Sequence, residues 1–404
     1  MIEKMFDLII FPMHDWKKGQ AEGFRTRDGH LMQHFDRQER IGKILVVDRP
    51  TTLPEMLLLR RRWRVHSNRI IHRTARTCLS QVSDRIYVLD IFARDLLKPL
   101  RLRMSWWDTI FRCPAVIEQI QRAADELALR NRVLFLWSPL STGVIGKLNE
   151  DYVVFDALDN WSEHPGMVRS RDRILAGYDT IKKCADLMFA NAESIVKFLD
   201  NGRTPVQYIP NGVNPERFCV ASELPGDIAA IPNPRVGYGG KLDKRLDVEL
   251  MAYVAQQIPE ANFIFVGPFL DRKWVSPLRR KSNIYFLGDK HYDVYPRYIQ
   301  SFDICLIPHY VGGFDADHLK LYEYLAARKP VVATAVVGAK QFEGMIAITH
   351  SRKDFVMAIN NYMRQTQIGE GLVDLQIPHN CVWEYKAEQM INRITGLYAD
   401  ANKR

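Results

Sequence analysis

The chain has 404 residues and a formal net charge of +9, with 47% hydrophobic and 25% charged residues. This composition is that of a globular protein, and the length allows two domains with separate cores. No run approaches the roughly 20 apolar residues that a membrane-spanning helix needs. The amino terminus lacks a small-residue cleavage site, so we predict no secretory signal and a cytoplasmic protein. The six cysteines lie far apart without metal-ligand spacing, which favours reduced thiols over a zinc site.

Short apolar runs rich in β-branched and aromatic residues alternate with helical patterns along the whole chain. This alternation predicts an α/β protein with parallel sheets covered by helices, and the number of runs favours two sheets over one. The predicted strands are Phe6–Phe11, Lys43–Asp48, Arg85–Leu89, Val133–Trp137, Tyr152–Phe155 and Leu187–Ala190 in the first half, and Arg235–Tyr238, Asn262–Val266, Asn283–Leu287, Asp303–Ile307, Pro330–Thr334 and Ile346–Thr349 in the second.

The connection after the first predicted strand is long, running from Pro12 to His30. Unusual length favours a functional loop. Three basic residues of this loop, Arg25, Arg27 and His30, should lie near the start of the next helix. There they are candidates for contact with an acidic acceptor or a phosphate, although solvent-facing roles fit their positions equally well.

Positive charge is concentrated between Leu57 and Arg112, where thirteen Lys or Arg residues stand against four Asp residues. Leucines and tryptophans are interleaved with these charges, a mixture typical of a segment that rests on an anionic membrane surface. A solvated basic face over ordinary core leucines explains the same pattern. Nucleic-acid binding is disfavoured, because no DNA- or RNA-binding signature accompanies the charge.

The predicted strand Tyr152–Phe155 leads into a loop that carries Asp156 and Asp159. A carboxylate at the end of a parallel strand faces the ligand-binding edge of the sheet and can deprotonate an acceptor hydroxyl. We predict that Asp159 is this base, with capping of the following turn as its structural alternative. Asp156 is nearer the strand, and we predict that it is structural.

A stretch rich in proline and glycine, from Val206 to Pro234, predicts a linker between two domains. Beyond it, Gly237–Arg245 forms a glycine-rich turn between a strand and a helix. Glycines allow backbone amides to approach a phosphate, the helix N-terminus adds a positive dipole end, and Lys241 and Arg245 supply charge. The pattern is neither G-x-G-x-x-G nor a Walker loop, so alone it also fits an ordinary structural turn.

The stretch from Asp315 to Thr334 predicts a short helix running into a buried strand, with Asp315, Lys320 and Glu323 near the helix start. Carboxylates accept hydrogen bonds from sugar and ribose hydroxyls, and a lysine attracts a diphosphate, so the set suits a sugar nucleotide. Asp315-Ala-Asp317 also fits a metal-binding D-x-D motif. We disfavour that reading, because the adjacent lysine can neutralise phosphate without a metal, and we predict no metal site.

Together these segments resemble bacterial glycosyltransferases of the two-domain GT-B fold over most of the chain. Tyr208–Phe218 looks like the interdomain I-P-N-G-V-D…F signature, and Gly239–Leu242 resembles the G-R-L phosphate loop with Lys in place of Arg. Asp315–Glu323 resembles the E-x7-E element with Asp replacing the first Glu. Phe155–Trp161 and the first loop narrow the resemblance to the group that includes teichuronic-acid glycosyltransferases.

The resemblance implies two Rossmann-like, doubly wound parallel-sheet domains facing a cleft. It places an acceptor-binding domain at residues 1–220, a nucleotide-sugar-binding domain at 221–380 and a helix in 381–404 that packs back on the first domain. It further implies that Glu323 holds the ribose of a UDP- or GDP-linked sugar, that lysine and arginine side chains hold the diphosphate, and that no other cofactor is needed. The implied donor-binding set is Gly239, Gly240, Lys241, Arg245, Asp315, Lys320, Leu321 and Glu323.

The resemblance leaves two stereochemical outcomes open. Most enzymes with E-x7-E retain the anomeric configuration without an enzymic base, whereas Asp159 falls where a xanthan-type glucuronosyltransferase has its aspartate base. An aspartate base implies direct displacement with inversion, which we favour.

The sequence therefore predicts a metal-independent glycosyltransferase that moves a hexosyl or glycuronosyl group to a lipid-linked or polysaccharide acceptor in cell-surface polysaccharide biosynthesis. The basic segment Leu57–Arg112 is predicted to hold it at the inner face of the cell membrane, without a nucleic-acid partner. The alternatives are a sugar-nucleotide epimerase or hydrolase of the same fold, and a non-catalytic basic protein that binds membrane or nucleic acid.

Overall fold

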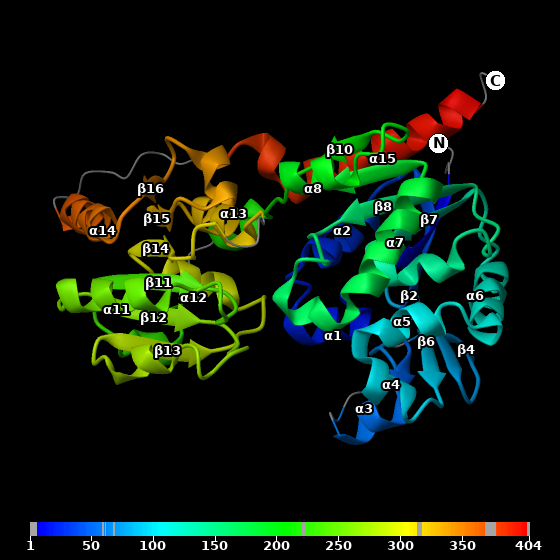
Figure 1. Ribbon diagram of the computed structural model, residues 1–404, viewed down its shortest axis with the longest axis horizontal. Helices are drawn as coiled ribbons and strands as arrows, with labels where there is room; N and C mark the ends of the chain where they lie inside the picture. Colours follow the sequence, from blue (N-terminus) through cyan, green and yellow to red (C-terminus); the bar gives the residue numbers. More distant parts are fainter. Residues whose placement is uncertain are drawn as a thin grey trace. The chain divides into compact units, whose positions relative to one another are not determined.

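The computed structural model describes residues 6–58, 60, 62–67, 69–219, 223–312, 317–367 and 377–401. The chain divides into two compact units, one of Met1–Ile209 with Lys386–Arg404 and one of Pro210–Tyr385. The division falls inside the predicted linker, at residue 209 rather than residue 220. Each unit has its own sheet (Figure 1), so the prediction of two sheets is confirmed.

The first unit is built on a ten-stranded sheet. Its strands are β1 (Phe6–Phe11), β2 (Ile41–Val47), β3 (Thr51–Thr52), β4 (Arg69–Arg73), β5 (Thr77–Gln81), β6 (Ile86–Ala93), β7 (Arg132–Leu136), β8 (Tyr152–Ala157), β9 (Leu187–Ala190) and β10 (Val206–Tyr208). Their order is β10-β9-β8-β7-β1-β2-β6-β5-β4, with β3 paired to β6. The central strands β1, β2, β7 and β8 are almost wholly buried, which is why they form continuous apolar runs in the sequence.

Part of the basic segment forms an antiparallel addition to this otherwise parallel sheet. β4 pairs antiparallel with β5, and β5 pairs antiparallel with β6. The sequence analysis missed β4 and β5, because β4 is an exposed, arginine-flanked edge strand without a buried apolar face. The all-parallel prediction is therefore wrong at this edge of the first sheet.

The helices of the first unit begin inside the loop that the sequence analysis predicted after the first strand. They are α1 (Trp16–Glu22), α2 (Arg27–Phe35), α3 (Leu53–Leu58), α4 (Lys98–Leu102), α5 (Trp106–Ile110), α6 (Pro114–Glu126), α7 (Arg171–Cys184), α8 (Glu193–Leu199) and most of α15 (Trp383–Ala401). The predicted long loop after β1 is wrong, because it contains α1 and the start of α2. Asp15 caps α1 by accepting a hydrogen bond from the Lys18 amide, and Gly23 ends it in the left-handed conformation.

The final helix, α15, runs from Trp383 to Ala401, within the predicted range 381–404. Its apolar stripe is buried, and the ring of Tyr398 stacks on Phe6 of β1 with 5.9 Å between ring centroids. The Tyr398 hydroxyl donates to the carbonyl of Asn131 at 2.9 Å. Residues from Lys386 onward accordingly belong to the first unit.

The second unit is a doubly wound, six-stranded parallel sheet in the order β13-β12-β11-β14-β15-β16. One face of the sheet packs against α9, α12 and α13, and the other against α11 and α14. The elements are β11 (Arg235–Gly239), β12 (Asn262–Val266), β13 (Ile284–Gly288), β14 (Ile304–Ile307), β15 (Val331–Thr334), β16 (Ala347–Thr349), α9 (Pro215–Cys219), α10 (Gly226–Ala229), α11 (Val248–Gln257), α12 (Tyr295–Gln300), α13 (Leu319–Ala326) and α14 (Arg352–Gln367).

Strand order reverses between β11 and β14 in the second sheet. In open α/β sheets, ligands bind beyond the carboxyl ends of the strands at such a switch point. The loops that follow β11 and β14 are therefore where the fold positions a ligand. Among the described residues, no helix combines the length and apolar character required to cross a membrane.

Candidate active site

The loop after β11 begins with two glycines that allow a lysine to approach the backbone closely. Gly240 has a φ of +148°, and a Cβ at this position would lie 2.9 Å from the side-chain Cε of Lys320. Both glycine amides already donate hydrogen bonds within the protein, Gly239 to the Tyr324 hydroxyl and Gly240 to the Val266 carbonyl, each at 2.8 Å. Gly240 thus contributes space for Lys320 and Gly239 space for the Tyr295 side chain, while their amides are engaged within the protein.

Lys320, in the first turn of α13, points at the glycine loop. Its Nζ donates to the hydroxyl of Tyr238 at 3.1 Å and lies 3.4 Å from Nε2 of His309. Burial and the nearby Arg245 guanidinium lower the pKa of Lys320 to about 7. The protonated form of Lys320 therefore lacks sufficient negative charge around it. An anion bound beside Nζ would stabilise this protonated form and raise the pKa.

Two histidines beside Lys320 share its buried environment. Burial, followed by the charge of Lys320, lowers the pKa of His309 well below its ordinary value and that of His318 to about 3. The two rings lie 4.9 Å apart in an edge-to-face contact. Both histidines remain neutral near pH 7, so Nε2 of His309 can accept a hydrogen bond from Nζ of Lys320.

The remaining cations of the loop differ in their partners. Arg245 is half-buried and makes a bidentate contact with Asp243, with nitrogen-to-oxygen distances of 2.8 Å and 3.0 Å. Lys241 is exposed, and its carbonyl accepts a hydrogen bond from the Tyr238 hydroxyl. Asp243 offsets part of the charge of Arg245, yet the pKa of Lys320 stays lowered.

Glu323 is buried one turn further along α13, with 6% of its surface exposed. Its Oε1 accepts a hydrogen bond from the Tyr292 hydroxyl at 2.9 Å. Tyr292 follows β13, so the carboxylate lies near the carboxyl ends of the strands, where a ligand hydroxyl can reach it. Leu321, also predicted as a donor residue, places its side chain in the apolar core, and a donor contact at Leu321 stays a prediction.

Asp315 lies outside the described residues. Asp317, the other carboxylate of the predicted D-x-D alternative, accepts hydrogen bonds from the Asn211 amide at 2.6 Å, the Tyr322 hydroxyl at 2.9 Å and Gln341 at 2.8 Å. These contacts give Asp317 a structural role in joining the start of the second unit to α13. Within the described part of the chain, no group of three or more His, Cys, Asp or Glu residues is arranged to hold a metal ion.

The predicted acceptor residues of the first unit lie at the start of α2. Arg27 is buried and forms a bidentate ion pair with Asp156, which also accepts a hydrogen bond from the Trp137 indole at 2.7 Å. Arg25 is half-buried and pairs with Glu22, whereas His30 is buried. The engaged guanidinium of Arg27 favours a structural role, as we predicted for Asp156.

Asp159 follows β8 at the carboxyl edge of the first sheet and is half-buried. Its carbonyl accepts a hydrogen bond from the Tyr178 hydroxyl at 3.0 Å, which fixes the turn that contains it. Its role as a base stays a prediction. A second candidate at the same edge, missed by the sequence analysis, is His14, whose Nδ1 lies 3.1 Å from Asp28. The two residues are fourteen positions apart, so no local pattern connects them.

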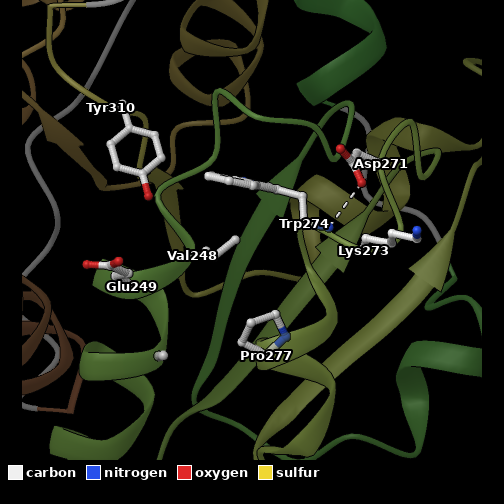
Figure 2. A pocket seen from close by; sticks show the side chains of 8 residues that line it. Val248, Glu249, Asp271, Lys273, Trp274, Pro277 and Tyr310 are labelled. Atoms are coloured by element: carbon white, nitrogen blue, oxygen red, sulfur yellow. Dashed lines mark hydrogen bonds between the residues drawn. The ribbon is translucent and has the colours of Figure 1, made fainter.

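A separate groove of about 500 Å³ lies on the second unit beside the start of α11 (Figure 2). Its walls include Trp274 and Tyr310, whose rings meet edge to face at 6.1 Å. The Trp274 indole donates to the carbonyl of Leu246 at 3.0 Å. None of the predicted donor residues lines this groove, so it is distinct from the cluster around Lys320.

Comparison with solved structures identifies the class of fold. Sucrose-phosphate synthase from Thermosynechococcus elongatus is similar over 98% of this chain and 100% of that chain, with a TM-score of 0.66 and 16% identity. HepE from Anabaena, solved in complex with UDP and glucose, is similar over 97% of this chain and 100% of that chain, with a TM-score of 0.62 and 15% identity. The chain has the GT-B fold, and the predicted fold is confirmed.

Comparison of sequences adds a narrower likeness. Residues 233–365, which lie within the second unit, match the family described as Glycosyl transferases group 1. The putative teichuronic acid biosynthesis glycosyltransferase TuaH of Bacillus subtilis (strain 168) is 28% identical over 204 residues, which cover 46% of this chain and 50% of that protein. The match spans half the length of this curated relative. The predicted resemblance to bacterial GT-B glycosyltransferases is confirmed.

Proposed function

We propose that this protein is a glycosyltransferase whose second unit binds a nucleoside diphosphate sugar. The observation that carries the proposal is the cluster of basic side chains at the β11–β14 switch point, where Nζ of Lys320 lies 3.4 Å from Nε2 of His309 and the rings of His309 and His318 lie 4.9 Å apart. A diphosphate supplies the negative charge that this site needs. Glu323, held by Tyr292, is placed one turn away as an acceptor for ribose hydroxyls.

The chemistry of transfer follows from these groups. When the bond from the anomeric carbon to the diphosphate breaks, negative charge builds up on the departing phosphate oxygen. Lys320 and Arg245 are fixed cations that stabilise this charge, and Lys241 adds a third from the exposed side of the loop. The proposed reaction is therefore independent of a metal ion. The match to the glycosyl transferases group 1 family over the second unit supports this assignment.

The acceptor is proposed to be a lipid-linked or growing polysaccharide bound by the first unit. The name of the Bacillus subtilis relative, which refers to teichuronic acid biosynthesis, supports a role in cell-surface polysaccharide formation. Direct displacement with inversion is the proposed outcome, and it requires a base at the carboxyl edge of the first sheet. Asp159 and His14 are the two candidates for that base.

Peripheral attachment to the inner face of the cell membrane is proposed through α3 and α4, both at the lower end of the first unit in Figure 1. Two leucines of α3 and the leucine just before α4 are unusually exposed, with 70% of Leu57, 73% of Leu58 and 79% of Leu97 accessible. Basic side chains such as Arg101 flank them. Exposed leucines beside basic side chains favour binding to an anionic lipid surface, because the leucines can enter the lipid while the basic groups contact the headgroups. Trp106, in contrast, is buried and contributes to the core.

The function is tested by incubating the protein with UDP- and GDP-linked sugars, with and without extracted bacterial membrane lipids. Transfer is expected to release UDP or GDP and to move labelled sugar into the lipid fraction. Conversion of the sugar nucleotide without lipid would instead identify an epimerase, and release of free sugar a hydrolase. Activity that disappears in a chelator would contradict metal independence.

Membrane attachment is tested by flotation with anionic and with neutral liposomes. The protein should float with anionic vesicles, and added salt should release it, because the attraction to the surface is screened. A Leu57→Ser/Leu58→Ser variant should float less. Leu270→Ser is the matched control, because Leu270 is 60% exposed on the second unit. Equal flotation with both kinds of vesicle would exclude an electrostatic anchor.

A further inference from the structure

The groove beside α11 on the second unit is lined by residues from three separate segments (Figure 2). Val248 and Ala252 lie on α11, Trp274 and Pro277 belong to the stretch between β12 and β13, and Tyr310 follows β14. The volume of about 500 Å³ is in the range of sites that take a small molecule. The groove is therefore large enough to hold a ligand of its own.

The two aromatic walls of the groove are held in fixed positions. The Trp274 backbone amide donates a hydrogen bond to Oδ1 of Asp271 at 3.0 Å, in addition to the contact of its indole with the Leu246 carbonyl. The Tyr310 backbone amide donates to the carbonyl of Arg245 at 3.0 Å. Tyr310 is nevertheless 38% exposed and Trp274 is half-buried, so both rings keep uncovered surface. Rigid aromatic surface of this kind binds a ligand at a low cost in conformational entropy.

The charges of the residues that line the groove are balanced once Arg352 is counted. Of the two carboxylates, Glu249 lies 2.8 Å from the guanidinium of Arg352, and Asp271 accepts the hydrogen bond of the Trp274 amide. Lys273 supplies the second cation and is exposed. An ionic ligand would therefore meet no excess of the opposite charge, which favours a neutral ligand. Both carboxylates keep capacity for further hydrogen bonds, because a carboxylate accepts about four.

These features match the chemistry of a sugar ring. A pyranose has faces of C–H groups, which are apolar enough to lie against an aromatic ring, and a rim of hydroxyl groups that donate hydrogen bonds. The groove offers aromatic rings along its wall and carboxylate oxygens at Glu249 and Asp271. A wholly apolar ligand would cover these carboxylates without giving them a hydrogen-bond donor, which is unfavourable. A nucleotide would bring negative charge to a groove whose own charges already cancel.

The groove and the donor site share one stretch of backbone. The carbonyl of Arg245, at the end of the glycine-rich loop, holds the backbone of Tyr310. The carbonyl of the next residue, Leu246, holds the indole of Trp274. A saccharide in the groove is thus bound by the same unit, and beside the same loop, as the proposed donor. This placement favours a sugar that takes part in the same reaction.

We propose that this groove is a second saccharide site, which binds a neutral sugar unit of the growing polysaccharide outside the donor site. The C–H face of the pyranose lies against Trp274 and Tyr310, and its hydroxyls donate to Glu249 and Asp271. The site makes and breaks no bond. It holds the acceptor chain by a unit other than the reacting one, which raises the local concentration of that chain. This role rests on the proposed glycosyltransferase function, whereas the ligand class rests on the groove alone.

Saturation-transfer NMR with neutral saccharides tests the ligand class. The probes are glucose, galactose, N-acetylglucosamine, N-acetylgalactosamine and cellobiose. At least one should bind in the millimolar range and receive saturation most strongly at the protons of one ring face. Tyr310→Ala removes one wall, and Ala252→Trp fills the groove from α11 while leaving both aromatic walls in place. Each should lower the affinity by about tenfold or more and leave UDP or GDP binding unchanged, which shows that the variant is folded.

Tyr208→Ala is the matched control, because Tyr208 is 45% exposed on the first unit. It should bind the saccharide as the wild type does, and so should the donor-site double variant Lys320→Ala/Glu323→Ala. No saturation of any probe would overturn the proposal, as would binding that survives both groove variants. Binding lost only in the double variant would place the saccharide in the donor site. Binding of a neutral apolar peptide but of no saccharide would assign the groove to a protein partner.

The role in the reaction is measured with lipid-linked polysaccharide acceptors of increasing length. Ala252→Trp should raise the KM for the long acceptors by about tenfold and leave kcat and the KM for the shortest acceptor unchanged. An unchanged KM at every length would contradict a hold on the acceptor. Sugar transfer by a wild type that binds no saccharide would remove this inference alone. Saccharide binding by a protein that transfers no sugar would remove the proposed function and leave the ligand class of the groove.

Discussion

Two lysines at the carboxyl edges of the two sheets face opposite environments. In the first unit, Nζ of Lys17 lies 2.8 Å from both Asp48 and Asp90, and although burial lowers its pKa, the two carboxylates outweigh burial and raise it. In the second unit, burial and Arg245 lower the pKa of Lys320 to about 7. One lysine is neutralised by the fold, and the other is not.

The difference separates structural charge from charge kept for a ligand. At the first edge the fold supplies the counter-charges of Lys17, which ties α1 to the end of β2 and to β6. At the second edge, the buried Lys320 lacks matching negative charge, which lowers the stability of the fold. Such destabilised charged groups are typical of functional sites. The same substitution at the two lysines should consequently have opposite effects on stability and on nucleotide binding.

The largest effect is expected from Lys17→Met. Removing the ammonium leaves two buried carboxylates without their cation, so the free energy of unfolding should fall by about 3–5 kcal/mol. Denaturant unfolding measures this change. Lys18→Met is the control, because the Lys18 side chain is 38% exposed and should alter stability little. A loss as small as that of the control would mean that the Lys17 cluster is not structural.

Lys320→Met should weaken UDP or GDP binding by about 10–100-fold, because it removes a charge-assisted contact to the diphosphate. The free energy of unfolding should stay constant or rise by about 1–2 kcal/mol, since the buried ammonium is lost with its desolvation cost. Calorimetric titration and denaturant unfolding measure the two quantities. A variant that is less stable and binds nucleotide normally would reverse the comparison with Lys17.

The pH dependence of nucleotide affinity should sharpen the same contrast. A bound diphosphate raises the pKa of Lys320 above its free value of about 7, so binding is strongest below pH 7 and weakens as pH rises through that value. Affinity should fall by about tenfold between pH 7 and pH 9. Lys320→Arg should remove this dependence, because arginine stays charged. A flat profile in the wild type would contradict the lowered pKa.

The lowered pKa of Lys320 should also make the free energy of unfolding depend on pH. Because the pKa of Lys320 is lower in the folded state than its ordinary value of 10.5, the unfolded chain binds more protons between about pH 7 and pH 10. The Lys320 contribution to the free energy of unfolding therefore rises with pH across this window. The difference in stability between wild type and Lys320→Met should shrink as pH rises, and a constant difference would contradict this linkage.

A smaller effect is expected from Glu323→Gln. Replacing the buried carboxylate by an amide should weaken UDP or GDP binding by about 1 kcal/mol and reduce the preference for ribose over 2′,3′-dideoxyribose. Titration of both nucleotide forms into both proteins measures the coupling between Glu323 and the ribose hydroxyls. Equal losses for both sugars would mean that Glu323 acts on Tyr292 and the fold rather than on the ribose.

Local patterns predicted the core of the fold well. The twelve predicted strands correspond to observed strands, with boundaries shifted by a few residues, because buried parallel strands form continuous apolar runs. The antiparallel pair β4–β5 was missed, since β4 is exposed and its pairing is set by a partner strand. Helix α1 was missed because its Asp15 cap and Gly23 terminus enclose only seven residues.

The charged members of the donor site could be predicted, but their surroundings could not. Lys320 and Glu323 stand near a recognisable helix start, whereas Tyr238 lies 82 positions from Lys320 and Tyr292 lies 31 from Glu323. His14 precedes α1 and Asp28 lies in α2, and the two residues meet only in the folded chain. Such contacts depend on tertiary packing, which neither spacing nor periodicity encodes.

The central claim is that Lys320 and Glu323 hold a nucleoside diphosphate in the second unit, and calorimetric titration of UDP and GDP into wild type and Lys320→Ala/Glu323→Ala tests it most directly. We predict that the wild type binds one of the two nucleotides and that the double variant, still folded, loses that binding by roughly 100-fold or more. Unchanged binding in the double variant would contradict the assignment of the donor site.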